Sequence, residues 1–193
     1  MKKHLTVYCG SSTGSNPIYI AQSKALAIEM VANKYHLMYG AGNVGLMGVI
    51  ADEIMTLGGE TVGVIPQHLI DREVGHKGLT ELIVTQTMHE RKHIMAERTN
   101  GFIAMPGGVG TLEEIIEIMT WSQLDLHPYP VCFYNVNGYY DKLFEFMSHM
   151  VEEGFLKQFH IDKLILESDP KKLIERIINY ESKNQGKWVS AHD

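Results

Sequence analysis

The stretch GFIAMPGGVGTLEEIIEIMTWSQL, residues 101–124, joins a short apolar run to a longer segment through a turn rich in glycine. The run GFIAMPG, residues 101–107, is apolar throughout, which is typical of a strand buried on both faces of a parallel sheet. The segment from Thr111 to Leu124 predicts a helix. This order of strand, turn and helix indicates an α/β protein.

The same alternation of apolar runs and helical segments extends over most of the chain. Because parallel strands need long connections, it predicts a doubly wound, mostly parallel sheet with helices on both faces, Rossmann-like in its build. We assign residues 1–181 to a single domain and residues 182–193 to a loose polar tail. The expected strands are 4–10, 36–42, 61–66, 81–86, 101–107, 130–136 and 164–167, and the expected helices are 17–35, 44–57, 88–98, 111–124, 139–153 and 170–181, with a loop at 70–78.

The composition excludes several classes of function. A net charge of -6 argues against broad binding to nucleic acid, which needs a basic surface. No apolar run approaches the ~18 residues of a membrane span, and the run after Lys3 is too short for a signal peptide. Cys9 and Cys132 both lie in apolar strands, so we expect reduced core thiols and a cytoplasmic protein without a membrane partner.

Three of the expected strands end in segments rich in glycine. These segments are CGSSTGSNP at residues 9–17, YGAGNVGLMG at 39–48 and MPGGVGTLEE at 105–114. Ligands of doubly wound sheets bind beyond the carboxyl ends of the strands, and all three segments fall at that edge. One such segment is more often a turn than a site, but three at one edge predict a nucleotide or phosphate site.

The segment at 105–114 carries the clearest indication of phosphate binding. Gly107, Gly108 and Gly110 allow a close approach to the backbone, and Thr111 is the expected N-cap of a helix whose positive end would face the anion. The pattern is neither a Walker P-loop nor G-x-G-x-x-G, so it favours a single nucleotide over a dinucleotide cofactor.

Two carboxylates, Glu113 and Glu114, follow this turn within one helical step of each other. An acidic side chain beside a phosphate must be offset by a cation or used in chemistry, and Arg91 and Lys92, one element earlier, are the expected cations. We expect Glu113, which points about 100° around the helix from Glu114, to serve mainly helix stability.

The pentapeptide HERKH, residues 89–93, also matches the H-E-x-x-H pattern of zinc peptidases. In that interpretation His89 and His93 bind the metal, Glu90 is the base and Glu117 is a conceivable third ligand. Lys92 would then lie beside the metal, and zinc would not explain three glycine-rich strand ends. A metallopeptidase therefore remains a remote alternative, and we predict no metal site.

Taken together, MHERK at residues 88–92, FIAMPGGVGTLEE at 102–114 and TWSQL at 120–124 resemble the LOG family. These proteins are cytokinin riboside 5′-monophosphate phosphoribohydrolases, long labelled lysine decarboxylase-like. The resemblance covers nearly the whole chain, including GVIPQHLIDRE at 63–73 and NVNGYYDKL at 135–143. The chain departs from many relatives at Ala41 and Asp125, where glycine is common.

The resemblance implies hydrolysis of the N-glycosidic bond of a nucleoside 5′-monophosphate, giving a free base and ribose 5-phosphate without any cofactor. It makes Arg91 and Glu114 the catalytic pair. It makes Lys92, the Gly107–Thr111 turn, Glu73 and Thr120 contacts of the nucleotide. We also expect other residues to line the substrate site, namely Ser12, Gly42, Met88 and Val109.

Other functions and the assembly state remain open in the sequence. A nucleotide-binding protein without turnover would use the same turn and cations, but it would gain nothing from Glu114 beside its ligand. Lysine decarboxylation would need a lysine that carries pyridoxal. The segment 111–124 is apolar on more than one face, and the resemblance implies a homodimer or a larger homo-oligomer. The identity of the base is not specified.

Overall fold

A computed structural model describes residues 2–70 and 75–182, which form one sheet flanked by helices. The seven strands of this part of the chain are β1 (Lys3–Tyr8), β2 (Tyr35–Tyr39), β3 (Thr61–Pro66), β4 (Glu81–Thr85), β5 (Phe102–Ala104), β6 (Val131–Tyr134) and β7 (Ile165–Glu167). Every neighbouring pair is parallel, which confirms the predicted sheet.

The helices connect successive strands, as the alternating sequence pattern predicted. They are α1 (Ile18–Ala32), α2 (Gly45–Thr56), α3 (Gln67–Ile70), α4 (Met88–Glu97), α5 (Val109–Gln123), α6 (Asp141–Glu152), α7 (Gln158–Asp162) and α8 (Pro170–Ile178), with a 3-10 turn η1 at Val136–Gly138. The sequence pattern did not predict α3 and α7, because helices of four and five residues are too short to show a hydrophobic period.

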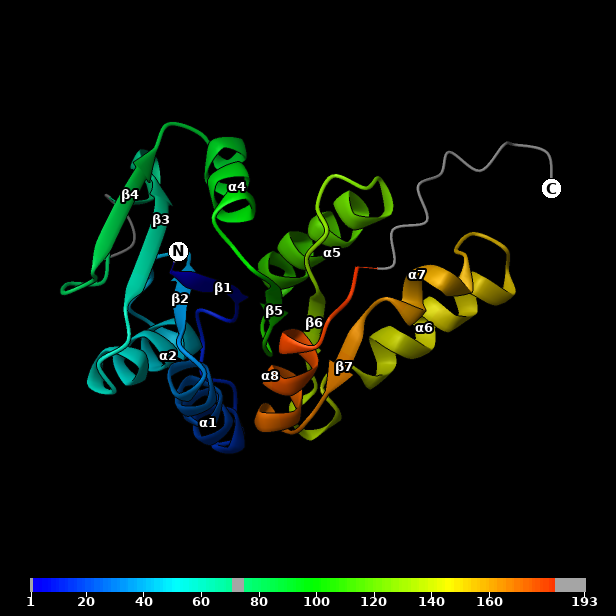
Figure 1. Cartoon of the computed structure of the whole chain (residues 1–193), viewed down its shortest axis with the longest axis horizontal. Helices are drawn as coiled ribbons and strands as arrows, with labels where there is room; N and C mark the ends of the chain where they lie inside the picture. The colour runs from blue at the N-terminus through cyan, green and yellow to red at the C-terminus, as the bar shows by residue number, and fades with distance from the viewer. Residues whose placement is uncertain (1, 71–74, 183–193) are drawn as a thin grey trace.

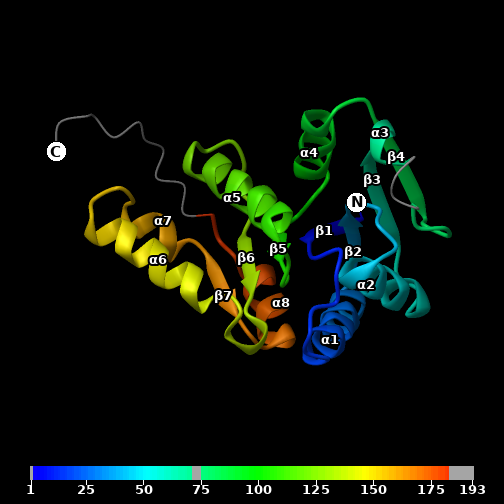
Figure 2. The ribbon, with the colours of Figure 1, turned by 180° about the vertical axis from the view of Figure 1, so that it is seen from behind.

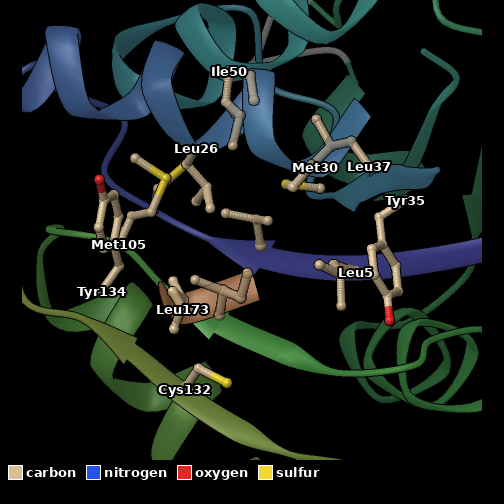
Figure 3. Close-up of a cluster of buried hydrophobic side chains, with 14 of the residues drawn as sticks. Leu5, Leu26, Met30, Tyr35, Leu37, Ile50, Met105, Cys132, Tyr134 and Leu173 are labelled. Atoms are coloured by element: carbon tan, nitrogen blue, oxygen red, sulfur yellow. The ribbon is translucent and has the colours of Figure 1, made fainter. Parts of the chain in front are cut away.

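The sheet separates two hydrophobic clusters, and apolar residues of β5 and β6 alternate between them. Leu5 and Val7 of β1 pack with α1, α2 and α8 on one face, and Figure 3 shows part of this cluster around Leu26, Ile50 and Leu173. Tyr8 packs with α4, α5 and α6 on the other face. The two groups of helices lie on opposite sides of the sheet in Figures 1 and 2. Burial on both faces explains why the central strands are apolar throughout.

The strand order β4-β3-β2-β1-β5-β6-β7 reverses direction beside β1. The chain winds outward from β1 to β4 and then returns to β5 on the other side of β1. Such a switch point opens a crevice at the carboxyl ends of the two strands. Here the backbone N–H of Gly10, after β1, donates to the carbonyl of Pro106, after β5, at 3.1 Å. The first and third glycine-rich segments therefore meet at the crevice.

The edge strand β4 differs from the prediction of strands covered on both faces. Leu82 and Val84 are 47% and 42% exposed, whereas the central strands are buried. An apolar run at the edge of a sheet has a neighbour on one side only, so the pattern of apolar residues did not reveal its position. No helix in the described part of the chain is long and apolar enough to cross a membrane.

Candidate active site

A cavity of about 590 Å³ opens at the switch point, beyond the carboxyl ends of β1 and β2 and between α4 and the start of α5. Its wall contains many of the residues that the sequence predicted. These are Met88, Arg91, Lys92, Gly108, Val109, Gly110, Thr111 and Glu114. Cys9, Gly40, Met47, Leu69 and Glu113 also line it, although the sequence analysis had not assigned them to the site.

The remaining predicted residues have other positions. Gly107 does not line this cavity but a separate one, and an added Cβ there would collide with Thr111 Oγ1 and approach Gly10 N to 2.8 Å. Ser12 lines the same separate cavity of about 340 Å³ on the other side of the glycine turn. At Gly42 a Cβ would meet the side chain of Met47. Glu73 lies outside the described residues.

Thr120 is exposed on α5 and does not line the cavity; its hydroxyl donates to the carbonyl of Ile116. It lies nine residues after Thr111, which corresponds to about 13 Å along a helix. Within one copy of the chain, Thr120 therefore cannot contact a nucleotide deep in this cavity unless α5 moves far. It could otherwise contact only a nucleotide that is bound by another copy.

Arg91 of α4 and Glu114 of α5 form a largely buried ion pair in the wall of the cavity. The distance from Arg91 Nη2 to Glu114 Oε1 is 2.9 Å, and the two side chains are 12% and 15% exposed. Burial raises the pKa of Glu114 above its ordinary value, and the charge of Arg91 opposes this rise without cancelling it. The guanidinium thus favours the ionised form of Glu114, but burial has the larger effect.

The guanidinium of Arg91 has one further contact and one nitrogen without a partner in the described part of the chain. Nη1 donates to the sulfur of Met88 at 3.3 Å, which gives Met88 a supporting role in addition to its place in the wall. Nε is buried and has no hydrogen-bond partner among the described residues. A buried N–H without a partner is costly, so this donor is an unsatisfied group of the pair.

A second ion cluster lies next to the first on the same two helices. Lys92 Nζ is 2.5 Å from Glu113 Oε1 and 3.0 Å from Glu117 Oε2. Burial alone would lower the pKa of Lys92, but its hydrogen bonds to the two carboxylates raise the pKa overall. Glu113 is therefore more than the helix-stabilising residue that the sequence suggested, because it pairs with Lys92 at the cavity wall. Its spacing of four residues from Glu117 was the available signal.

The start of α5 supplies free backbone donors to the cavity. The helix begins at Val109, and Gly108 occupies the N-cap position with an extended backbone. The prediction of Thr111 as the N-cap was wrong, because the turn is shorter than the glycine pattern suggested. No side chain in the described part of the chain caps this helix, so its first N–H groups remain available. A Cβ at Gly108 or Gly110 would meet nothing within 4 Å.

The segment that matches H-E-x-x-H lies at the start of α4, where Glu90 takes part in the helix cap. Thr87 is the N-cap and accepts a hydrogen bond from Glu90 N, while the Glu90 carboxylate accepts one from Gln86 N at 2.7 Å. This arrangement is close to a capping box, except that the carboxylate accepts from the residue before the N-cap. His89 is exposed, and exposed His93 lies 3.1 Å from Glu97. Among the described residues there is no group of three or more side chains that could hold a metal ion.

The fold and this site define a class of protein: a Rossmann-like α/β protein with a buried carboxylate–guanidinium pair beside a helix terminus suited to phosphate. Residues 47–177 match a protein family described as "Possible lysine decarboxylase". A cytokinin riboside 5′-monophosphate phosphoribohydrolase of Arabidopsis thaliana is 39% identical, over 95% of this chain and 81% of the relative. A probable enzyme of the same name from Oryza sativa subsp. japonica is 40% identical, over 95% of this chain and 75% of the relative.

The chain therefore belongs to the LOG family, which confirms the resemblance seen in the sequence. Solved structures show the same fold at much lower identity. A molybdenum cofactor carrier protein from Chlamydomonas reinhardtii matches with a TM-score of 0.68 at 18% identity, over 93% of this chain and all of that chain. A molybdenum cofactor binding protein from Rippkaea orientalis gives 0.66 at 19% identity, over 92% of this chain and 96% of that chain.

Proposed function

We propose that this protein hydrolyses the N-glycosidic bond of a nucleoside 5′-monophosphate and releases the free base and ribose 5-phosphate. The observation that carries the proposal is the buried Arg91–Glu114 pair, which lies in one cavity with the uncapped start of α5. The names of the Arabidopsis and rice relatives support it, because they describe this reaction for a cytokinin nucleotide.

The chemistry follows from the charge that develops on the sugar. When the bond from C1′ to the base nitrogen breaks, its electron pair leaves with the base and positive charge grows on the ribose, much as in glycoside hydrolysis. Ionised Glu114 stabilises that charge and takes a proton from the attacking water. The water oxygen becomes bonded to C1′, and the proton taken by Glu114 is passed to the departing nitrogen of the base, which restores the carboxylate. Arg91 holds the carboxylate in place and directs it toward the ribose.

The 5′-phosphate binds at the opposite end of the substrate. The free N–H groups of the Gly108–Thr111 turn and the positive end of α5 suit an anion, and Val109 at this turn is 82% exposed. Lys92 adds positive charge once it shares its ammonium group between the phosphate and Glu113. Anchoring the phosphate aligns C1′ with Glu114, so remote binding energy assists the reaction. Glu73, Ser12, Gly42 and Met88 remain proposed contacts of the nucleotide.

We also propose a homodimer. The outer face of α5 leaves apolar side chains uncovered, with Ile116 37% and Leu124 60% exposed, and the neighbouring Leu126 is 66% exposed. A mainly apolar cavity of about 460 Å³ lies beside them, between Trp121 and His93. In a dimer that covers this face, Thr120 could contact a nucleotide held by the neighbouring copy. Both cysteines are free and buried, which supports a reducing compartment such as the cytoplasm.

Two other functions are less well supported. A carrier that only binds nucleotides would gain nothing from Glu114, whose negative charge opposes the binding of a phosphate. A decarboxylase would need a neutral lysine to form a Schiff base with pyridoxal. Lys92 is buried between two carboxylates that raise its pKa, so it is held as a cation.

A panel of nucleotides tests the proposed reaction. The purified protein is incubated with AMP, GMP, CMP, N6-prenylated AMP and unphosphorylated adenosine, and free base is measured by chromatography. We expect release of base from at least one adenine nucleotide and much slower release from adenosine, which lacks the phosphate anchor. No free base from any nucleotide would contradict the proposal and favour the carrier.

A further inference from the structure

Gly40 lies at the carboxyl end of β2 and lines the same cavity as Arg91 and Glu114. A Cβ added at this position would come closer than 3.0 Å to Arg91 Nη2, a separation that real Cβ atoms do not show. The same atom would be 3.4 Å from Arg91 Cζ and 3.9 Å from Met47 Sδ. The guanidinium therefore occupies the space in which any other residue would place its side chain.

The backbone conformation does not explain a glycine at this position. The φ angle of Gly40 lies outside the left-handed region, whereas Gly45 in the following turn has φ of 61°. An L-residue can adopt the backbone of Gly40 without strain. What requires glycine is the contact with Arg91 across the mouth of the cavity.

We infer that Gly40 is a positioning residue whose missing side chain allows the Arg91 guanidinium to lie against β2 and reach Glu114. Together with the Met88 sulfur on Nη1 and the Glu114 carboxylate on Nη2, Gly40 defines the third side of the position that Arg91 occupies. The expected loss of turnover rests on the proposed function, in which Arg91 and Glu114 are catalytic. The expected displacement of the guanidinium from Glu114 does not depend on that function.

The nature of the clashing atom predicts what Gly40→Ala would change. At Gly40 the clash is with the end of a flexible side chain, which can move. At Gly48 a Cβ would instead meet the backbone carbonyl of Asn43, which cannot move without disturbing the turn before α2. Gly40→Ala should therefore fold normally and displace the guanidinium from Glu114, whereas Gly48→Ala should lower stability.

Three measurements on Gly40→Ala test the inference, with Gly75→Ala as a matched control. A Cβ at Gly75 would meet nothing within 4 Å, and its φ is also outside the left-handed region. The measurements are the melting temperature, the steady-state rate with AMP, and the titration of the Glu114 carboxyl by ¹³C NMR. The Glu114 signal is assigned by its disappearance in Glu114→Gln. The same titration is repeated for Gly40→Ala in an Arg91→Ala background.

We expect Gly40→Ala to melt close to the native protein and to lose kcat by on the order of 10²-fold, as displaced catalytic groups do. KM should change less than kcat. The Glu114 carboxyl should titrate at higher pH, because the opposing cation has moved away. In the Arg91→Ala background, adding Gly40→Ala should not shift the titration further. Gly75→Ala should resemble the native protein in all three measurements.

The possible results separate this inference from the proposed function. An unchanged Glu114 titration in Gly40→Ala would overturn the inference, and so would failure of the variant to fold, because the guanidinium is expected to give way. If the Glu114 titration shifts as expected but the native protein releases no base from any nucleotide, the positioning role stands and the proposed reaction fails.

Discussion

Two ion clusters lie side by side between α4 and α5, built from neighbouring residues of each helix. Arg91 with Glu114 is a single buried pair with no net charge, and one guanidinium N–H has no partner among the described residues. Lys92 with Glu113 and Glu117 carries one excess negative charge, and the Glu113 side chain is 55% exposed. The same types of residue thus form a pair with one buried N–H, unpartnered in the part of the chain that the structure describes, and a cluster whose cation is held by two carboxylates.

This difference shows that residue type alone does not assign a role. A buried pair with a free donor can act on a ligand, because low local dielectric strengthens its charges. A cation held by two carboxylates must first exchange a partner before it can bind phosphate. The comparison therefore predicts different effects for substitutions that look alike in the sequence.

The largest effect is expected from Glu114→Gln. The amide keeps the shape of the side chain but cannot stabilise positive charge or accept a proton from water. Loss of a general base typically lowers rates by about 10²–10⁴-fold, so kcat with AMP should fall by this order. Calorimetric titration should show AMP affinity within a few-fold of the native protein. Turnover at the native rate would remove Glu114 from the mechanism.

Arg91→Ala should be nearly as damaging and should also change the pH dependence. The native enzyme needs ionised Glu114, so activity should fall as pH decreases through a pKa above the ordinary 4.5, because burial raises it. Removing Arg91 removes the opposing charge, so the acid limb of the rate profile should move to higher pH. An acid limb at the same pH in both proteins would show that the pair does not control the titration.

A smaller effect, of opposite sign, is expected from Glu113→Gln. This change leaves Lys92 with one carboxylate and reduces the net charge of the two clusters from −1 to zero. Because Glu113 is half exposed, the gain should be modest, roughly a threefold tighter binding of AMP. The gain should shrink at high salt. Glu145→Gln on exposed α6 is the control, and equal effects of both substitutions would indicate a long-range charge effect only.

The smallest effect is expected from a change at the start of α4, the helix that carries Arg91 and Lys92. Thr87→Ala removes the N-cap and should lower the free energy of unfolding by about 1 kcal/mol, measured by urea denaturation. Thr56→Ala, near the end of α2, is the control because its hydroxyl only bonds the carbonyl of Asp52. Treatment with a chelator should change neither stability nor activity. Stoichiometric zinc in the purified protein would return His89 and His93 to consideration.

The sequence predicted the features that depend on local pattern. Runs such as GFIAMPG gave buried strands, their alternation with helical segments gave the parallel sheet, and glycine at three strand ends indicated the correct edge. One local pattern was ambiguous, because Glu90 caps the start of α4 and also stands where a metal motif has its glutamate. The start of α5 was placed too late because glycine at the N-cap is less common than serine or threonine.

The features that the sequence could not provide depend on contacts between distant segments. Lys92 and Glu113 are 21 positions apart, and only the packing of α4 against α5 brings them together. Gly40 was within a recognised glycine segment, but its contact with Arg91 requires β2 and α4 to meet at the switch point. The resemblance to the family implies that Thr120 contacts the nucleotide. The position of Thr120 in a single copy of the chain does not explain such a contact.

The most direct test of the proposed mechanism is a crystal structure of Glu114→Gln with AMP bound, since this variant should retain the uncleaved nucleotide. We expect the phosphate oxygens within hydrogen-bond distance of the N–H groups at Gly108–Thr111, and C1′ beside the substituted side chain at position 114 with Arg91 close to the ribose. Intact AMP bound elsewhere, with the start of α5 empty, would contradict the account.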